Sequence, residues 1–327
     1  MKQSVQLSII STIDKYIKDY LETIYQTGKS DQTIKKYTNI LYQFKLFNLD
    51  YIRNSGLKLT IEDINQIYIK EYIKYLQGTK KSINTQNQHL ITVKSFLYYI
   101  CDNEPKIEHV RTNISKFKIK VHHNKINSFT MDEREKILVL ADKLSLSKKY
   151  TDIRDAAIFK VLLYTGIRAN ELLQIKWADI LVLDTDSKDL QEPILKFRIK
   201  AKGGEIEHVY ILESLISEEL SYLKSKSNSA FVFVSHTSQL PLDRRVVFGM
   251  IKNRLKKIFI YDASIHKMRH TFANYLKSIG ENLETIQRLC RHKSIAITAK
   301  YYLDTSEENK IDVAKRIGNN KLTIQHK

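Results

Sequence analysis

The chain has 327 residues, of which 43% are hydrophobic, so it can bury one large core or two ordinary ones and is not a disordered tail. Its 54 Lys and Arg residues against 36 Asp and Glu give a formal charge of +18, which predicts a polyanionic partner rather than a small acidic substrate. No apolar run reaches the length of a membrane span and no signal peptide is recognisable, so we expect a soluble, cytoplasmic protein that does not bind a membrane.

The numbers of cysteine and glycine residues and the distribution of charge indicate the compartment, the fold class and the kind of partner. Cys101 and Cys290 are too few for a disulfide framework or a metal cluster, which fits a reducing compartment. Nine Gly and three Pro leave few chain breakers, so we expect a mainly helical protein. Residues 1–125 and the remainder each carry a net charge of +9. A membrane binder usually concentrates its charge on one helix, whereas charge on both halves suits a protein that surrounds DNA.

Residues 1–112 are expected to form a helical domain. Apolar residues recur there at spacings of three and four, as in amphipathic helices, and each apolar stripe needs a partner to bury it. Breaks at 28–30 and 78–82 separate the stripes. The sequence therefore predicts a compact unit of four helices, with stripes at Ile10–Ile24, Ile34–Phe44, Ile64–Leu76 and Leu90–Ile100.

Between Pro105 and Lys125 the apolar periodicity fades and basic residues accumulate. We interpret residues 113–125 as a basic linker that lies along the DNA phosphates. A connector that is merely solvated is the alternative.

Residues 126–327 are expected to form a second domain, mainly helical with a small antiparallel sheet. A capping box at Thr130–Glu133 starts a helix over 131–143, and a second helix is expected over 151–165. Everything beyond about Arg245 is expected to be helical again. Near the end of the chain, residues 306–317 could form a short helix that docks on its own domain or on a neighbouring protomer.

The sheet is predicted from a change of periodicity. Leu195, Phe197 and Ile199 alternate with basic residues, which is typical of a half-buried strand. The Gly203-Gly204 turn and a return strand over 208–212 complete a hairpin with Lys202 at its tip. A third strand is possible at Phe231–Val234.

Three short segments carry residues suited to chemistry. Arg168 lies within Thr165–Leu172, Arg269 lies within His266–His270, and Leu289–His292 is followed nine residues later by Tyr301. Each segment is weak evidence alone, but their order and spacing resemble the tyrosine recombinase (phage integrase) family. That family has an Arg in TGxRxxEL, a Lys on a β-hairpin, HxLRH, LGH, and a Tyr nine residues after the last His. The helices over 13–47 and 82–100 also resemble its core-binding domain, so the resemblance implies a core-binding domain followed by a catalytic domain.

Cutting DNA without a metal requires a nucleophile, cations that stabilise the phosphorane-like transition state, a base and an acid. Two guanidinium groups suit the two non-bridging phosphate oxygens because each presents a planar, permanently charged fork. The resemblance implies no metal and no cofactor. It implies that Arg168 and Arg269 hold the oxygens, Tyr301 attacks to form a 3′-phosphotyrosine, His266 helps to remove the Tyr proton, Lys202 protonates the 5′-hydroxyl, and His292 hydrogen-bonds the phosphate.

Other interpretations compete for some of these residues. His266 and His270 at i and i+4 could hold a metal, but no third ligand is evident. We therefore assign His270 a structural or phosphate-contacting role. Glu171 is expected to orient its helix rather than to do chemistry.

Two assignments have a competing residue nearby. The adjacent Tyr302 is the competitor for Tyr301. Lys196 and Lys200 compete with Lys202, which is selected by the turn and by the family's Lys-Gly pair.

The chain departs from the family pattern at two positions. Met268 replaces a Leu, which is a conservative apolar exchange. Arg291 replaces the Gly of LGH, and a residue with a side chain there would cost about 1 kcal/mol in a left-handed backbone or shift the turn that places His292. Arg291 could instead add a phosphate contact.

The resemblance implies site-specific recombination of double-stranded DNA with paired half-sites. Four protomers, identical or including a related recombinase, would exchange strands through a Holliday junction. The length leaves no room for an additional arm-binding domain, which favours the Xer type. A mobile-element integrase is the alternative within the family. A catalytically inactive DNA-binding regulator and a topoisomerase are the alternatives outside it, and the complete set of catalytic residue types counts against the regulator.

Overall fold

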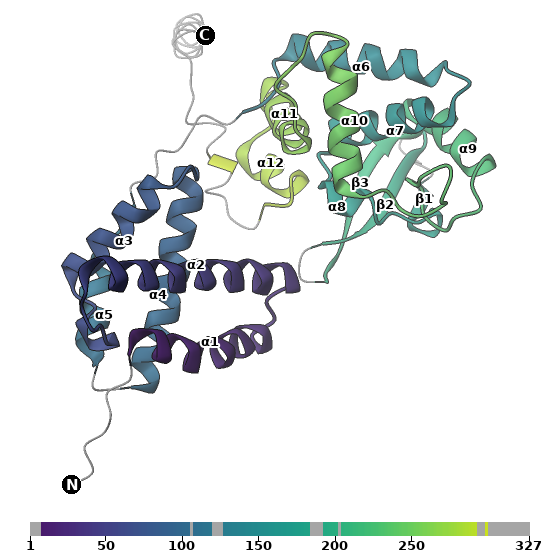
Figure 1. The fold of residues 1–327 in the computed structure, drawn as a ribbon. Helices are drawn as coiled ribbons and strands as arrows, with labels where there is room; N and C mark the ends of the chain where they lie inside the picture. The colour runs from purple at the N-terminus through teal and green to yellow at the C-terminus, as the bar shows by residue number, and fades with distance from the viewer. Residues whose placement is uncertain are drawn as a thin grey trace, which may run out of the picture. The chain divides into compact units, whose positions relative to one another are not determined.

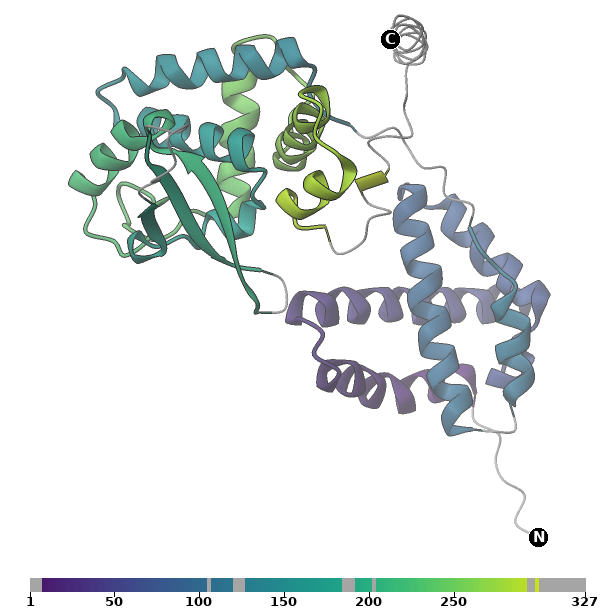
Figure 2. The same cartoon turned by 180° about the vertical axis from the view of Figure 1, so that it is seen from behind.

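The computed structural model describes residues 8–104, 107–119, 127–183, 192–201, 204–292 and 298–299. The chain divides into two compact units, Met1–His123 and Asn124–Lys327, each with its own hydrophobic core. Figure 1 and Figure 2 show the two units from opposite sides. The structure confirms a mainly helical fold with a small antiparallel sheet. Within the ranges given above, no helix is both long enough and apolar enough to cross a membrane.

The first unit is a bundle whose core is rich in aromatic rings. Phe44 and Phe47 of one helix pack against Tyr72 of another with ring centroids 5.2 and 5.0 Å apart. Three of its helices begin at side-chain N-caps, where Ser or Asn accepts a backbone N–H. Its described helices are α1 (Ile9–Gln26), α2 (Asp31–Ser55), α3 (Gln66–Gly78), α4 (Ile83–Asn103) and α5 (Glu108–Ser115), with a 3₁₀ turn at Ile61–Asp63.

Helix α5 was not expected from the sequence. It has two turns and its buried residues are Val110 and Ile114, so it carries too few apolar residues to display a periodicity. Both residues pack into the core of the first unit. The helix therefore crosses residue 112, where the sequence places the end of the first domain.

The second unit combines helices with the small sheet. The predicted helices over 131–143 and 151–165 are present as α6 and α7, each starting or ending within two residues of its expected bound. The elements of this unit are α6 (Met131–Ser145), α7 (Tyr150–Thr165), α8 (Ala169–Leu172), β1 (Ile180–Leu183), β2 (Ile194–Lys200), β3 (Ile206–Leu212), α9 (Ser217–Ser225), α10 (Arg244–Lys256), α11 (Ile265–Ser278) and α12 (Leu283–Leu289), with 3₁₀ turns at Trp177–Asp179 and Glu213–Leu215.

The sheet is antiparallel in the order β1-β2-β3. Phe197 of the central strand lies opposite Ile180 and Val209, and the alternating apolar residues of β2 are buried as expected. The third strand was wrongly placed: Phe231–Val234 makes isolated bridges to Lys176 and Pro241 instead. Its last three residues are all buried, so it lacks the two-faced alternation of a sheet strand.

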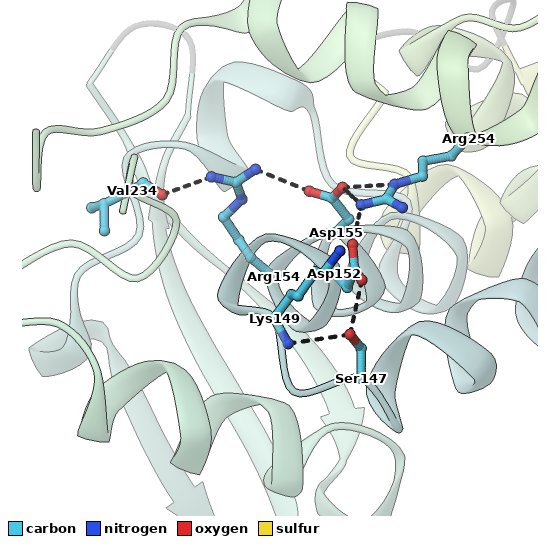
Figure 3. A network of polar contacts seen from close by, with 7 residues as sticks. All are labelled: Ser147, Lys149, Asp152, Arg154, Asp155, Val234 and Arg254. Atoms are coloured by element: carbon cyan, nitrogen blue, oxygen red, sulfur yellow. Dashed lines mark hydrogen bonds and ion pairs between the residues drawn. The ribbon is translucent and has the colours of Figure 1, made fainter. Parts of the chain in front are cut away.

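Helix α7 is buried along most of its length although it carries charged residues. Arg154 donates to the carbonyl oxygen of Val234 and to Asp155 Oδ1, both at 3.1 Å. Arg254 of α10 donates to Asp155 Oδ2 at 2.7 and 2.9 Å and to Asp152 Oδ1 at 2.5 Å (Figure 3). Because every one of these charges has a partner, the helix can be covered on all sides without leaving a buried ion uncompensated.

Helix α7 ends at Gly166, which has a left-handed backbone with φ of +59°. A Cβ atom at this position would lie 2.3 Å from Cδ1 of Phe272 in α11. The turn that leads into α8 therefore requires glycine for both its backbone conformation and its close contact with α11.

The substitution Gly166→Ala is expected to destabilise the second unit by about 2–4 kcal/mol, since a left-handed alanine is strained and its methyl group overlaps Phe272. Urea unfolding of the full chain, followed by the fluorescence of its single tryptophan, Trp177, reports on this unit alone.

Gly249→Ala is the matched control. Gly249 lies inside α10 and its Cβ would meet no atom within 4 Å, so alanine should stabilise the helix by about 0.5–1 kcal/mol. If both variants unfold at the wild-type urea concentration, the constraint at Gly166 does not exist.

Candidate active site

Arg168 lies in the turn between α7 and α8 and is the N-cap residue of α8. Its backbone N–H donates to Glu171 Oε2 at 3.0 Å, and its Nη1 donates to Glu171 Oε1 at 2.7 Å. Its Nη2 donates to the carbonyl oxygen of Arg291 at 2.9 Å. The guanidinium is thus fixed from two sides while a third of the side chain stays exposed. Glu171 orients this turn, as the sequence suggests.

Arg269 projects from α11 toward the same turn. Its Nη1 donates to the carbonyl oxygen of Gly166 at 2.6 Å, whereas its Nη2 is buried and has no hydrogen-bond partner among the residues that the structure describes. Burial and the nearby charge of Arg168 lower the pKa of Arg269 to about 10. A buried guanidinium with an unused donor beside a second guanidinium is a favourable place for an anion.

Three histidines surround the two arginines. Burial, followed by the charges of neighbouring arginines, lowers the pKa of His266 and lowers that of His292 to about 4. Burial, followed by the proximity of His266 and Arg269, lowers the pKa of His270 to about 4. His292 Nδ1 lies 2.9 Å from Thr298 Oγ1. At neutral pH these rings are uncharged, so they can exchange protons or hydrogen-bond a ligand without adding to the repulsion between the arginines.

The position of His292 depends on how α12 ends. Arg291 has a left-handed backbone with φ of +51°. Its N–H donates to the Arg288 carbonyl at 2.9 Å, and the N–H of His292 donates to the Gln287 carbonyl at 3.0 Å. These two bonds form a Schellman motif, which normally has glycine in the left-handed position. Arg291 therefore keeps the turn that glycine would make, and the turn is not shifted.

The sequence suggested a phosphate contact as one possibility for the Arg291 side chain, and the structure gives this side chain two acidic partners. It is 6% exposed, and its Nη2 lies 2.6 Å from Glu171 Oε2. Its Nε lies 2.9 Å from Glu207 Oε2 on β3. Both acidic partners compete with any phosphate, and through them this arginine supports the site, while its buried Nη1 has no hydrogen-bond partner among the described residues.

The described part of the chain brings together four of the six predicted site residues: Arg168, His266, Arg269 and His292. Lys202 and Tyr301 lie outside the described residues, as do Tyr302 and the expected helix over 306–317. The hairpin that carries Lys202 is present, and its strands end at Lys200 and Ile206.

Sequence reasoning missed two contributors. Arg244, at the start of α10, lowers the pKa of His266, and Glu207 binds Arg291. Neither residue belongs to a motif, and no spacing rule would have indicated it.

Comparison with known proteins places the chain in a family. Residues 127–309 match the model of the phage integrase family, and residues 12–104 match that of the phage integrase SAM-like domain. Tyrosine recombinase XerC of Thermodesulfovibrio yellowstonii is 29% identical over 88% of this chain and 90% of its own length. Tyrosine recombinase XerA of Pyrococcus horikoshii is 27% identical over 92% of each chain.

Solved structures share the fold. The XerH site-specific recombinase bound to its difH substrate aligns with a TM-score of 0.67 at 18% identity, covering 92% of this chain and 88% of that one. The Tn1549 transposon integrase in complex with circular intermediate DNA also aligns with a TM-score of 0.67, at 16% identity over 95% of this chain and 99% of that one. Since the first family match alone spans more than half of the sequence, the chain belongs to the phage integrase family, and it is a Xer-like tyrosine recombinase.

Proposed function

We propose that this chain is a Xer-like site-specific recombinase that cleaves and rejoins double-stranded DNA through a 3′-phosphotyrosine intermediate. The observation that carries the proposal is the pair of guanidinium groups at one turn, with the buried Nη2 of Arg269 left without a partner in the described part of the chain. A phosphodiester is the anion that such a pair fits, because its two non-bridging oxygens accept from two planar forks. The charge of +18 and the DNA-bound relatives of similar fold support a DNA partner.

Each catalytic role follows from this placement of the phosphate. Arg168 and Arg269 stabilise the charge that develops on the phosphate oxygens, and His292 hydrogen-bonds one of them. The lowered pKa of His266 leaves the ring neutral at pH 7, so it can accept the proton of Tyr301 as that residue attacks. Lys202 gives a proton to the departing 5′-hydroxyl. The phosphotyrosine bond keeps the energy of the broken phosphodiester, so rejoining needs no nucleotide.

The domain roles and the assembly are proposed from the similarity to tyrosine recombinases. Residues 1–112, continued by the end of α5 at Ser115, act as the core-binding domain, the remainder of 113–125 as a basic linker and residues 126–327 as the catalytic domain. Four protomers, identical or including a related recombinase, would join two DNA sites of paired half-sites in the cytoplasm and exchange strands through a Holliday junction. The names of the relatives favour the Xer type over a mobile-element integrase.

Tyr301 is expected to form the covalent bond to DNA. The test uses a nicked duplex that carries the site which the protein selects from a pool of random DNA sequences. Tyr301→Phe should abolish the covalent adduct on a denaturing gel, whereas Tyr302→Phe should retain it. Loss of the adduct in Tyr302→Phe alone would assign the nucleophile to the neighbouring hydroxyl.

Lys202→Ala is expected to bind this DNA with close to wild-type affinity and to cleave it about 10²- to 10⁴-fold more slowly, since a general acid acts in the transition state rather than in binding. A 5′-bridging phosphorothioate has a sulfur leaving group that departs without a proton. It should restore cleavage by Lys202→Ala but not by Arg168→Ala, whose defect lies in charge stabilisation. Lys196→Ala and Lys200→Ala are the controls from the same hairpin. If the phosphorothioate rescues Lys196→Ala or Lys200→Ala instead of Lys202→Ala, the general acid is the lysine replaced in the rescued variant.

Cleavage is expected to persist at the wild-type rate in EDTA, because the arginines and Lys202 supply the positive charge that a metal supplies in other nucleases. The measurement is the rate of adduct formation with and without chelator. Loss of the adduct in EDTA and its return on adding Mg²⁺ would contradict the proposed chemistry.

A further inference from the structure

One buried carboxylate serves two arginines in the candidate site. Glu171 accepts from Arg168 through Oε1 at 2.7 Å and from Arg291 through Oε2 at 2.6 Å. Burial alone would raise the pKa of Glu171, but the hydrogen bond from Arg168 and the charge of Arg291 outweigh it, so the pKa is lowered and the carboxylate is charged. Arg168 is therefore held by a carboxylate whose second oxygen is occupied by Arg291.

Arg291 also reaches the sheet. Its Nε forms an ion pair with Glu207 on β3, which lies opposite Ile199 of β2. The next pair in this register, Lys200 with Ile206, ends the hairpin on which the sequence places Lys202. One guanidinium thus connects the support of Arg168 to the end of this hairpin.

We propose that Arg291 is a positioning residue that couples Arg168 to the β2–β3 hairpin through Glu171 and Glu207. The inference rests on the proposed function and deepens it, because it links the residue that holds the phosphate to the hairpin expected to protonate the leaving group. Neither arm requires Arg291 to touch DNA.

The left-handed backbone at Arg291 fits this role. A glycine would make the same Schellman turn without strain, so the turn alone does not require an arginine. Removing the guanidinium would leave Glu171 with one partner fewer and would leave Glu207 without this cation. Strain in the backbone is thus accompanied by two ion pairs that only a long, forked cation can make together.

Arg291→Gly separates the two contributions because it keeps the turn and removes the ion pairs. At saturating protein, its single-turnover cleavage of the selected nicked duplex is expected to be about ten- to a hundredfold slower than wild type, as for a misplaced catalytic group, with unchanged DNA affinity. Arg291→Lys keeps the charge but not the fork, so its rate should lie between the two. Weakened DNA binding at an unchanged cleavage rate would make Arg291 a DNA contact and overturn the inference.

Glu207→Gln tests the arm that reaches the hairpin. The single variant should cleave more slowly than wild type. The 5′-bridging phosphorothioate should restore its rate, because the defect lies in protonation of the leaving group. In the Arg291→Gly background it should add no further loss, since its partner is already gone. Losses that multiply in the double variant, or a wild-type rate in Glu207→Gln, would overturn the coupling.

Glu284→Gln is the matched control. It removes a carboxylate from the exposed pair that Glu284 makes with Arg288 at 2.6 Å on α12, and should leave cleavage unchanged. The urea transition of Trp177 fluorescence checks that each variant is folded. If Arg291→Gly is unfolded, Arg291→Lys and Glu207→Gln still decide the question.

The two proposals fail separately. A wild-type protein that forms no adduct on its selected site refutes the proposed function. A wild-type protein that cleaves together with an Arg291→Gly variant that cleaves equally fast refutes only the coupling.

Discussion

The turn at Gly166 sets the position of both arginines in the candidate site. Its left-handed backbone ends α7, its carbonyl oxygen accepts from Arg269, and two residues later Arg168 caps α8. The close contact of this glycine with Phe272 brings α11 against the turn. Two residues that are a hundred positions apart in the sequence therefore meet because one glycine allows two helices to approach.

The scaffold behind this turn is held by charges as well as by apolar packing. Helix α7 is fixed to α10 through Arg254 and to the Val234 segment through Arg154 (Figure 3). Replacing such a buried pair by apolar residues can be neutral, whereas removing one partner leaves an uncompensated ion that costs several kcal/mol. The network therefore penalises any displacement of α7 along its axis, and that displacement would also move Gly166.

The sequence predicts those parts of the fold that have a regular period. Leu195, Phe197 and Ile199 alternate and form the central strand, and the capping box at Thr130–Glu133 starts α6. Where the period is absent, prediction fails: α5 is too short to display one, and Phe231–Val234 is apolar on both faces because it is buried on both.

The candidate site also has a part that the sequence predicts and a part that it does not. Arg168, His266, Arg269 and His292 could be selected from motif spacing because each motif is local. The partners of Arg291 could not, since an arginine in a left-handed backbone and its ion pair with a strand residue are both set by tertiary contacts. Lys202 and Tyr301 stay predictions.

The Arg291–Glu171 ion pair responds to salt differently from contacts between exposed cations and DNA. Contacts between lysine or arginine and DNA phosphates weaken steeply as ionic strength rises, because each releases condensed counterions. The Arg291–Glu171 pair, whose side chains are 6% and 5% exposed, is shielded from mobile ions and is screened far less. A rise in salt that detaches the protein from DNA therefore leaves the Arg291–Glu171 pair intact, and with it the carboxylate that orients Arg168.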